Sequence, residues 1–242
     1  TQNITSVSIE NVITDKTRAI VCVHLGGWPC DMDPIMNLAE KYNLAVIEDC
    51  AQAHGARYKG RSVGSIGHVG AWSFCQDKIM TTGGEGGMVT TNDRESWSRM
   101  WSYKDHGKSW DAVYERDHPP GFRWVHESFG TNWRMTEMQA AIGRIQLKCL
   151  EDWNTKRLAN ANAIWKVARN LNGLRSPELR CSGCVGNCNT RNGCVHAAYK
   201  CYVFVDGSEN DRDKILSAIK RKGVPCFPGS CSEVYLERAF DH

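Results

Sequence analysis

The order of apolar and polar runs in the first fifty residues constrains the fold most strongly. A valine-rich run from Ala19 to Leu25 is followed by two glycines and a proline, which is typical of a buried strand and a turn. Asp33-Pro34 predicts a helix that continues to about Tyr42, because proline is tolerated in a first helical turn. The apolar run Leu44 to Ile47 predicts the next strand. A strand, a helix and a strand with short connections predict a parallel sheet in an α/β fold.

Two acidic residues, Glu48 and Asp49, end the second apolar run. They have two interpretations: a solvated strand end, or a binding site, since ligands of parallel sheets gather at the carboxyl ends of strands. The residues downstream favour the site. Gln52 follows at three residues, and Ser73 precedes a lone lysine, Lys78, by five residues in SFCQDKIMTTGGEGGM.

These residue types are the ones that a pyridoxal phosphate site requires. The cofactor carries out the difficult chemistry, so the protein supplies a lysine that binds it covalently, a carboxylate for the pyridine nitrogen and donors for the phosphate. A lysine reacts only when it is deprotonated, and apolar neighbours such as Phe74 and Ile79 suit a partly dry site for Lys78. Asp49 is the candidate for the ring nitrogen, and Gln52 is the candidate for the phenolic oxygen.

A family resemblance rests on three stretches of the chain. They are VIEDCAQAHGARYKGRSVGSIGHVGAWSFCQDKIMTTGGEGGMVTTND, GTNWRMTEMQAAIGRIQL and HAAYKCYVFV. These stretches resemble the DegT/DnrJ/EryC1/StrS family of sugar aminotransferases, which are fold-type I pyridoxal phosphate enzymes. The resemblance implies a large domain with a mostly parallel sheet flanked by helices, followed by the start of a small α+β domain at the C-terminal end.

The resemblance also implies roles for single residues. It places Asp49 at the pyridine nitrogen, Gln52 at the ring hydroxyl and Ser73 at the phosphate, and it makes Lys78 the covalent attachment point and the acid and base of proton transfer. Asn132 resembles a family asparagine that reaches the phosphate in the neighbouring subunit's site. A homodimer with shared active sites is therefore expected.

Two further residues are weaker candidates for substrate contact. His106 stands in a histidine-glycine pair that is similar to one near the family's substrate, although an exposed loop histidine is the alternative. Arg134 could direct its forked donors at a phosphate or serve as a surface cap. The implied reaction transfers an amino group from an amino acid, usually glutamate in the family, to a keto group of a nucleotide-linked sugar, for surface polysaccharide or glycoside biosynthesis.

The resemblance divides the chain into two parts. Residues 1–150 correspond to the cofactor-binding large domain, and residues 151–242 to a linking helix and the small domain. Family members begin earlier and end later than this chain, which has no initiator methionine, so we expect an internal fragment. A long helix from Met135 to about Leu171, a strand from Tyr199 to Val205 and a helix from Asp211 to Lys222 are predicted here.

Several other elements are predicted between the motifs. A hairpin is expected at 57–63, a strand at 69–74, a helix at 93–104 and a loop at 105–129, whereas TTGGEGG is expected to form tight turns with positive φ rather than ligand contacts. His54 is interpreted as a histidine of the core or one that supports a site, with a catalytic role as the less favoured alternative. The long helix carries an apolar stripe that we expect to pack in the core, and its residues are Met138, Ala141, Ile142, Ile145 and Leu150.

A cysteine-rich stretch, residues 181–196, is the least expected feature. Its potential metal ligands are Cys181, Cys184, Cys188, Cys194 and His196. No second C-x-x-C follows at zinc-ribbon spacing, so incidental thiols are the favoured interpretation and no metal is assigned. The twelve cysteines of the chain fit reduced cytoplasmic thiols better than a disulfide framework.

Composition and rival functions complete the predictions. Thirty basic residues against 27 acidic ones give a net charge of +3, too balanced for a nucleic-acid surface. No apolar run reaches membrane-spanning length, so no membrane contact is expected and a cytoplasmic location is the default. A related dehydratase branch replaces the lysine by histidine, and Lys78 argues against it. The other rival is a catalytically incomplete or regulatory relative that acts in assembly or metal binding.

Overall fold

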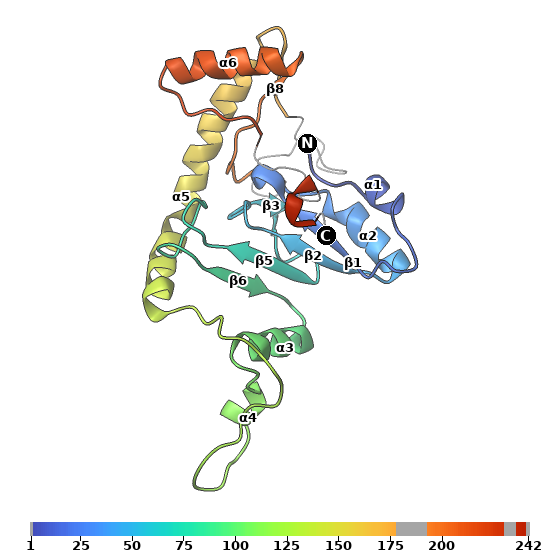
Figure 1. Ribbon diagram of the computed structural model, residues 1–242, viewed down its shortest axis with the longest axis vertical. Coiled ribbons are helices and arrows are strands. Elements are labelled where there is room, and N and C mark those ends of the chain that lie inside the picture. The colour runs from blue at the N-terminus through green and yellow to red at the C-terminus, as the bar shows by residue number, and fades with distance from the viewer. Residues whose placement is uncertain (1, 178–192, 230–235, 241–242) are drawn as a thin grey trace.

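The computed structural model describes residues 2–177, 193–229 and 236–240 (Figure 1). The helices and 3₁₀ turns in the described residues include α1 (Ser6–Glu10), η1 (Leu25–Gly27), α2 (Met32–Tyr42), α3 (Arg94–Lys104), α4 (Trp110–Tyr114), α5 (Glu137–Ala168), α6 (Glu209–Arg221) and η3 (Arg238–Phe240). The strands are β1 (Ala19–Val23), β2 (Ala45–Asp49), β3 (Arg57–Tyr58), β4 (Arg61–Ser62), β5 (Val69–Ser73), β6 (Gly87–Thr90), β7 (Leu174–Arg175) and β8 (Phe204–Val205).

The main sheet of the described residues has the strand order β1-β2-β5-β6. Strands β1, β2 and β5 are parallel, and β6 runs antiparallel to β5. Val23 pairs with Asp49, and Asp49 pairs with Ala71, so the carboxyl ends of the three parallel strands lie at one edge. The prediction of an α/β fold with a mostly parallel sheet flanked by helices is confirmed.

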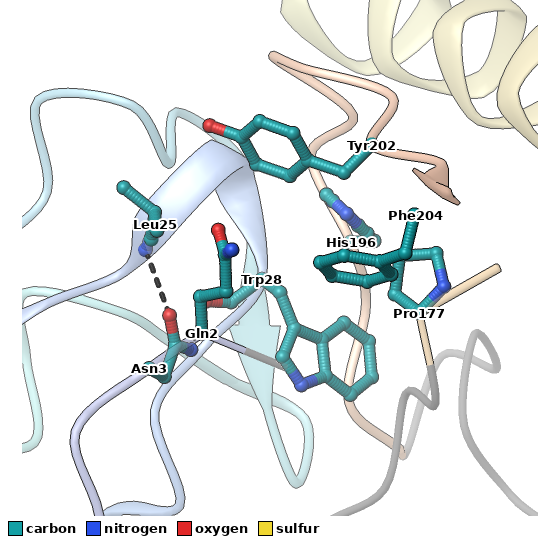
Figure 2. A pocket seen from close by; sticks show the side chains of 8 residues that line it. All are labelled: Gln2, Asn3, Leu25, Trp28, Pro177, His196, Tyr202 and Phe204. Atoms are coloured by element: carbon teal, nitrogen blue, oxygen red, sulfur yellow. Dashed lines mark hydrogen bonds between the residues drawn. The ribbon is translucent and has the colours of Figure 1, made fainter. Parts of the chain in front are cut away.

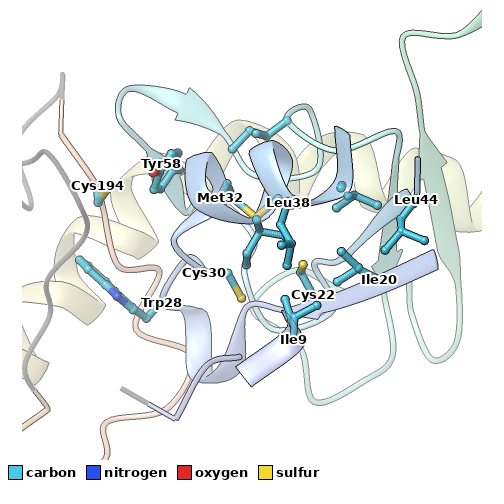
Figure 3. Close-up of a cluster of buried hydrophobic side chains, with 14 residues drawn as sticks. Ile9, Ile20, Cys22, Trp28, Cys30, Met32, Leu38, Leu44, Tyr58 and Cys194 are labelled. Carbon is cyan, nitrogen blue, oxygen red and sulfur yellow. The ribbon is translucent and has the colours of Figure 1, made fainter. Parts of the chain in front are cut away.

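Helix α2 covers one face of the sheet and closes the core there (Figure 3). Asp33 lies in its first turn, where a negative charge meets the positive end of the helix dipole, and Asn43 ends it in the left-handed conformation with φ of 51°. Its fully buried Met32 and Ile35 pack in one cluster with Cys22 of β1. Burial of each large side chain of this kind stabilises the fold by roughly 1.5–3 kcal/mol.

Strand β1 is buried on one face only, which corrects the prediction of a buried strand. Ile20 and Cys22 point toward α2, whereas Val21 is 54% exposed and Val23 is 37% exposed. Within the described residues, α2 covers a single face of this strand, so every second residue, including both valines, remains in contact with solvent.

Helix α5 lies within three residues of its predicted bounds, but most of its predicted apolar stripe does not face the protein. Met138, Ala141, Ile142 and Ile145 are exposed, and of the predicted stripe Leu150 alone packs against a buried cluster. Polar and small residues of α5 face the main body instead: Gln146 Oε1 accepts from the Thr81 backbone N–H at 2.8 Å, and Gln139 Nε2 donates to the Glu85 carbonyl at 2.8 Å. The predicted core stripe is therefore wrong, because hydrogen bonds to residues 81–85 set the rotation of the helix. Both partners, Thr81 and Glu85, lie in the loop between β5 and β6.

The C-terminal part of the chain rises with α5 away from the sheet and carries α6 and the β7–β8 pair (Figure 1). The predicted strand Tyr199–Val205 is confined to β8. Residues 195–200 bind other backbone instead: Ala197 N–H donates to the Gly27 carbonyl at 2.9 Å, and Lys200 N–H donates to the Gly26 carbonyl at 3.0 Å. This segment is therefore fixed on the glycine turn that follows β1.

The remaining local predictions are mostly confirmed. The β3–β4 hairpin, β5, α3 and α6 lie within two residues of their predicted bounds. The predicted loop at 105–129 contains the short helix α4, whose first turn is capped by the Ser109 side chain. An N-cap serine before an aromatic residue is the local signal for this helix.

Candidate active site

The carboxyl edge of the sheet gathers four of the predicted site residues. Asp49 is the last residue of β2, and Ser73 is the last residue of the adjacent strand β5. Gln52 follows β2 by three residues, and Lys78 follows β5 by five residues. All four are partly buried. The topology therefore brings a carboxylate, an amide, a hydroxyl and an amine to one edge.

Asp49 keeps one carboxylate oxygen available. Its Oδ1 accepts a hydrogen bond from the Ala51 backbone N–H at 3.0 Å, which forms an Asx turn directly after the strand. Oδ2 has no hydrogen-bond partner within the described residues. The turn fixes the side chain, so Oδ2 can accept a hydrogen bond from a protonated ring nitrogen.

The Gln52 amide is oriented by the turn after β1. Its Oε1 accepts from the Gly26 backbone N–H at 2.7 Å. Gly26 has φ of 65°, a conformation that glycine adopts without strain. Because the carbonyl end is occupied, the NH₂ end of Gln52 remains as a donor for an oxyanion.

Lys78 lies in the loop that leaves β5. Its backbone N–H donates to the Cys75 carbonyl at 3.1 Å, and its side chain is 16% exposed. The Nζ atom is 3.3 Å from Oδ1 of Asp77. Burial by itself would lower the pKa of Lys78, but Tyr199 and Asp77 outweigh it, so the pKa lies above its ordinary value.

The residues on either side of Lys78 complete the loop. Ser73 Oγ accepts from the Cys75 backbone N–H at 3.3 Å, so its own proton can be donated to a phosphate oxygen. Gly83 and Gly84 have φ of 81° and 140°. The predicted positive-φ turns are confirmed at these two glycines.

Glu48 is fully buried, so the interpretation as a solvated strand end is wrong for this residue. Its Oε2 accepts from His24 Nε2 at 3.0 Å and from the Gly64 N–H at 2.8 Å. Its Oε1 accepts from the backbone N–H groups of Ile66 at 2.8 Å and Gly67 at 2.7 Å. Burial alone would raise the pKa of Glu48, but the donors of His24, Gly64 and Gly67 hold it below its ordinary value.

His24 is the neutral member of this buried pair. Its Nδ1 accepts from the Cys30 backbone N–H at 3.0 Å, so the ring proton is on Nε2 and is donated to Glu48. His24, Glu48 and Cys50 bring potential metal-ligand atoms within 4.8 Å of one another. Hydrogen bonds to Cys30 and to residues 64–67 already occupy these two side chains. The pair therefore joins β2 to the neighbouring turns.

His54 lies beneath the lysine loop and is 3% exposed. Its ring contacts Trp72 and Phe74, with ring centroids 5.5 and 5.8 Å apart. Neither ring nitrogen has a hydrogen-bond partner within the described residues. Burial lowers the pKa of His54 to about 4, so this histidine is neutral at physiological pH.

Asn132, His106 and Arg134 form a second group on the segment between α3 and α5. Arg134 Nε donates to Asn132 Oδ1 at 3.1 Å, and the Arg134 guanidinium is 3.2 Å from His106 Nε2. His106 is exposed, with φ of 61°. None of the hydrogen bonds or ion pairs within the described residues joins this group to Lys78.

A cavity of about 20 Å³ lies elsewhere, between the N-terminal segment, η1 and residues 196–204 (Figure 2). The cavity is lined by Gln2, Asn3, Leu25, Trp28, Pro177, His196, Tyr202 and Phe204. Its volume admits about one water molecule, so it is too small for a cofactor.

The potential metal ligands of the cysteine-rich stretch are not brought together in the described residues. Cys181, Cys184 and Cys188 lie outside those residues. Cys194 is buried in the α2 core, and the His196 ring packs against Trp28 and Trp165, with ring centroids 5.7 and 5.3 Å away.

None of the helices in the described part of the chain combines the length and apolar composition that a membrane span requires.

The fold defines a class of protein: an α/β protein whose parallel strands end at one edge, the place where ligands of such sheets bind. The family model that describes the "DegT/DnrJ/EryC1/StrS aminotransferase family" matches residues 1–237. The chain belongs to this aminotransferase family.

Individual relatives agree with this assignment. The chain is 45% identical over 166 residues to a GDP-perosamine synthase of Escherichia coli, covering 69% of this chain and 42% of the relative. It is 42% identical over 245 residues to a UDP-N-acetyl-3-dehydro-alpha-D-glucosamine 3-aminotransferase of Acidithiobacillus ferrooxidans, covering 98% of this chain and 58% of the relative. The chain therefore spans about half the length of these curated relatives.

A solved structure extends the similarity to three dimensions. The aminotransferase from Psychrobacter cryohalolentis is 64% identical and superposes with a TM-score of 0.91, covering 99% of this chain and 61% of that chain.

Proposed function

We propose that this chain forms the cofactor-binding part of a pyridoxal phosphate-dependent aminotransferase that transfers an amino group from an amino acid to a keto group of a nucleotide-linked sugar. The observation that carries the proposal is the amine of Lys78 at the same sheet edge as Asp49 and Gln52. Two relatives whose names specify nucleotide-sugar products or substrates support the substrate class. Glutamate is the proposed donor, and surface polysaccharide or glycoside biosynthesis is the proposed pathway.

The available atoms at the sheet edge fit the cofactor. Asp49 has a carboxylate oxygen for the pyridine nitrogen, Gln52 has an oriented NH₂ group for the phenolic oxygen, and Ser73 has a hydroxyl proton for the phosphate. When bound, pyridoxal phosphate supplies an electron sink for the carbanion of the amino donor. The donor set of this chain therefore suits that group.

Lys78 has two proposed tasks. Its deprotonated amine would hold the cofactor, and after the amino donor had displaced it, Nζ would be the base that removes the donor's α-proton and the acid that returns a proton. Asp49 would keep the nitrogen of a bound pyridine ring protonated. Because the pKa of His54 is low, its ring is neutral and adds no second positive charge beside that of Lys78.

Asn132, His106 and Arg134 are proposed to act in a second subunit's site. They bond to one another, and no hydrogen bond or ion pair in the described part of the chain joins them to Lys78, which suits a homodimer with shared sites. The division at residue 150 into a cofactor-binding domain and a small domain stays a prediction, as does a cytoplasmic location. The metal-binding alternative rests on the cysteine-rich stretch, three of whose cysteines lie outside the described residues, and it stays untested.

Amino transfer tests the proposed function directly. The protein is incubated with pyridoxal phosphate, ¹⁵N-glutamate and a keto nucleotide sugar, and ¹⁵N incorporation into the sugar is measured by mass spectrometry. We expect incorporation by the wild type and by Lys200→Ala, whose substituted lysine is nearby and exposed, and none by Lys78→Ala. Incorporation by Lys78→Ala at the wild-type rate would contradict the proposal.

A further inference from the structure

Tyr199 reaches the lysine loop from the far end of the chain. Its hydroxyl donates to Oδ2 of Asp77 at 2.7 Å, across 122 positions of sequence. Oδ1 of the same carboxylate is 3.3 Å from Lys78 Nζ, and that Nζ is also 5.3 Å from the centroid of the Tyr199 ring. Asp77 therefore has the tyrosine hydroxyl on one oxygen and the lysine amine on the other.

The backbone around Tyr199 is fixed on both sides. Ala197 and Lys200 donate to the carbonyls of Gly27 and Gly26, on the same turn that orients Gln52. Ala198 between them has φ of 50°, an unfavourable conformation for a residue with a Cβ, and it is buried. The chain accepts this strain at the residue before Tyr199, which directs the ring toward Lys78.

The contacts of Tyr199 restrict a mobile side chain. Lysine has a flexible four-carbon stem, so a single ion pair at an exposed carboxylate would leave its amine poorly placed. The Asp77 side chain is 57% exposed, and the Tyr199 hydroxyl supplies the bond that holds it. That hydrogen bond is the main cause of the lowering of the Asp77 pKa to about 2.

We propose that Tyr199 is a positioning residue for Lys78: its hydroxyl holds the Asp77 carboxylate, and that carboxylate together with the tyrosine ring holds the lysine amine at the sheet edge. The significance of this arrangement for amino transfer rests on the proposed function. The arrangement also ties the C-terminal segment to the lysine loop, so the placement of the amine depends on both parts of the chain.

The pKa of the Lys78 amine in the cofactor-free protein tests the proposal. Lysines are ¹³C-methylated, the Lys78 signal is assigned by its loss in Lys78→Arg, and its pH titration is followed by NMR in Tyr199→Phe, Asp77→Asn and the double variant. We expect Asp77→Asn to lower the Lys78 pKa. Tyr199→Phe should lower it by about half a unit, the equivalent of a typical net hydrogen bond.

The double variant distinguishes positioning from a general structural effect. Because Tyr199 acts through Asp77, the double variant should titrate like Asp77→Asn alone, as a coupled pair does in a double-mutant cycle. Lys200 is the internal control: its Nζ lies 4.8 Å from the same ring, and phenylalanine retains that ring, so its titration should not change.

Three results would overturn the proposal: an unchanged Lys78 pKa in Tyr199→Phe, an unchanged pKa in Asp77→Asn, or full additivity of the two changes. Asp77 is exposed, so Asp77→Asn remains informative even if Tyr199→Phe fails to fold. The titration contains no cofactor. A failure of Lys78 to bind pyridoxal phosphate would therefore leave this result standing, and the reverse also holds.

Discussion

The buried carboxylate of Glu48 fixes the carboxyl edge of the sheet through its hydrogen bonds. Four donors converge on its two oxygens, three from the backbone of residues 64–67 and one from His24. Asp49, the neighbouring residue, points to the opposite face of the same strand. The buried carboxylate therefore fixes the strand end from which the proposed cofactor ligand projects.

Replacement of Glu48 by glutamine should destabilise the fold. An amide has one acceptor oxygen, so two of the four buried donors would face an NH₂ group, and we expect a loss of about 3 kcal/mol in the free energy of unfolding. Urea unfolding measures it. Glu10→Gln is the matched control, because the exposed Glu10–Lys41 ion pair should contribute little. Equal stability of Glu48→Gln and wild type would contradict this role.

His54 and His196 predict acid sensitivity. Burial lowers the pKa of each to about 4, below the ordinary value of 6.5. The unfolded chain therefore binds protons first as the pH falls, and stability present above pH 6.5 is lost between 6.5 and 4, by roughly 3 kcal/mol for each histidine. His54→Leu should remove about half of this loss in unfolding curves measured across that range. An unchanged pH dependence would show that His54 is not buried and neutral.

Strand β5 passes very close to the 64–67 turn at Gly70. A Cβ at Gly70 of β5 would lie 2.6 Å from the Gly64 Cα and carbonyl oxygen, so the strand and the 64–67 turn could not keep their contact. Gly70→Ala should destabilise the fold by about 1–3 kcal/mol, the usual cost of overpacking. Thermal unfolding measures the loss, with Val89→Ala on the exposed side of β6 as the control. A Tm like that of wild type would show that β5 and the turn are not in close contact.

Local patterns were sufficient to predict most elements and the position of Asp49, Ser73 and Lys78 at or just after strand ends, whereas their roles toward a cofactor stay predictions. Asp49 and Lys78 each follow a strand with a clear apolar run, and a parallel sheet brings such ends together. The rotation of α5 was not predictable, because its buried face is chosen by Gln139 and Gln146 bonds to a loop more than fifty residues away. Tyr199 was missed for the same reason: Asp77 is visible beside Lys78, but no local signal marks a tyrosine 122 positions later.

The group formed by Asn132, His106 and Arg134 bears on how whole subunits assemble. Asn132 and Arg134 bond to each other away from Lys78, so they are proposed to serve another subunit. Lys78→Ala and Asn132→Ala should each be inactive alone. Mixing the two after reversible dissociation should restore amino transfer, because one site of each hybrid dimer has an intact lysine and an intact asparagine.

The hybrid experiment separates shared from self-contained sites. If Asn132 acted in its own subunit, both sites of the hybrid would carry one defect and mixing would restore nothing. Lys78→Ala mixed with Lys78→Arg is the control, since no site in that hybrid has a lysine at position 78.

The attachment of the cofactor to Lys78 is the most direct test of the proposed site. The protein is incubated with pyridoxal phosphate, reduced with borohydride and digested, and the modified peptide is sequenced by mass spectrometry. We predict a single pyridoxyl modification on Lys78, with the absorbance of the bound cofactor lost in Lys78→Ala and kept in Lys200→Ala. A modification on Lys200 or spread over surface lysines, with Lys78 unmodified, would contradict the proposed site.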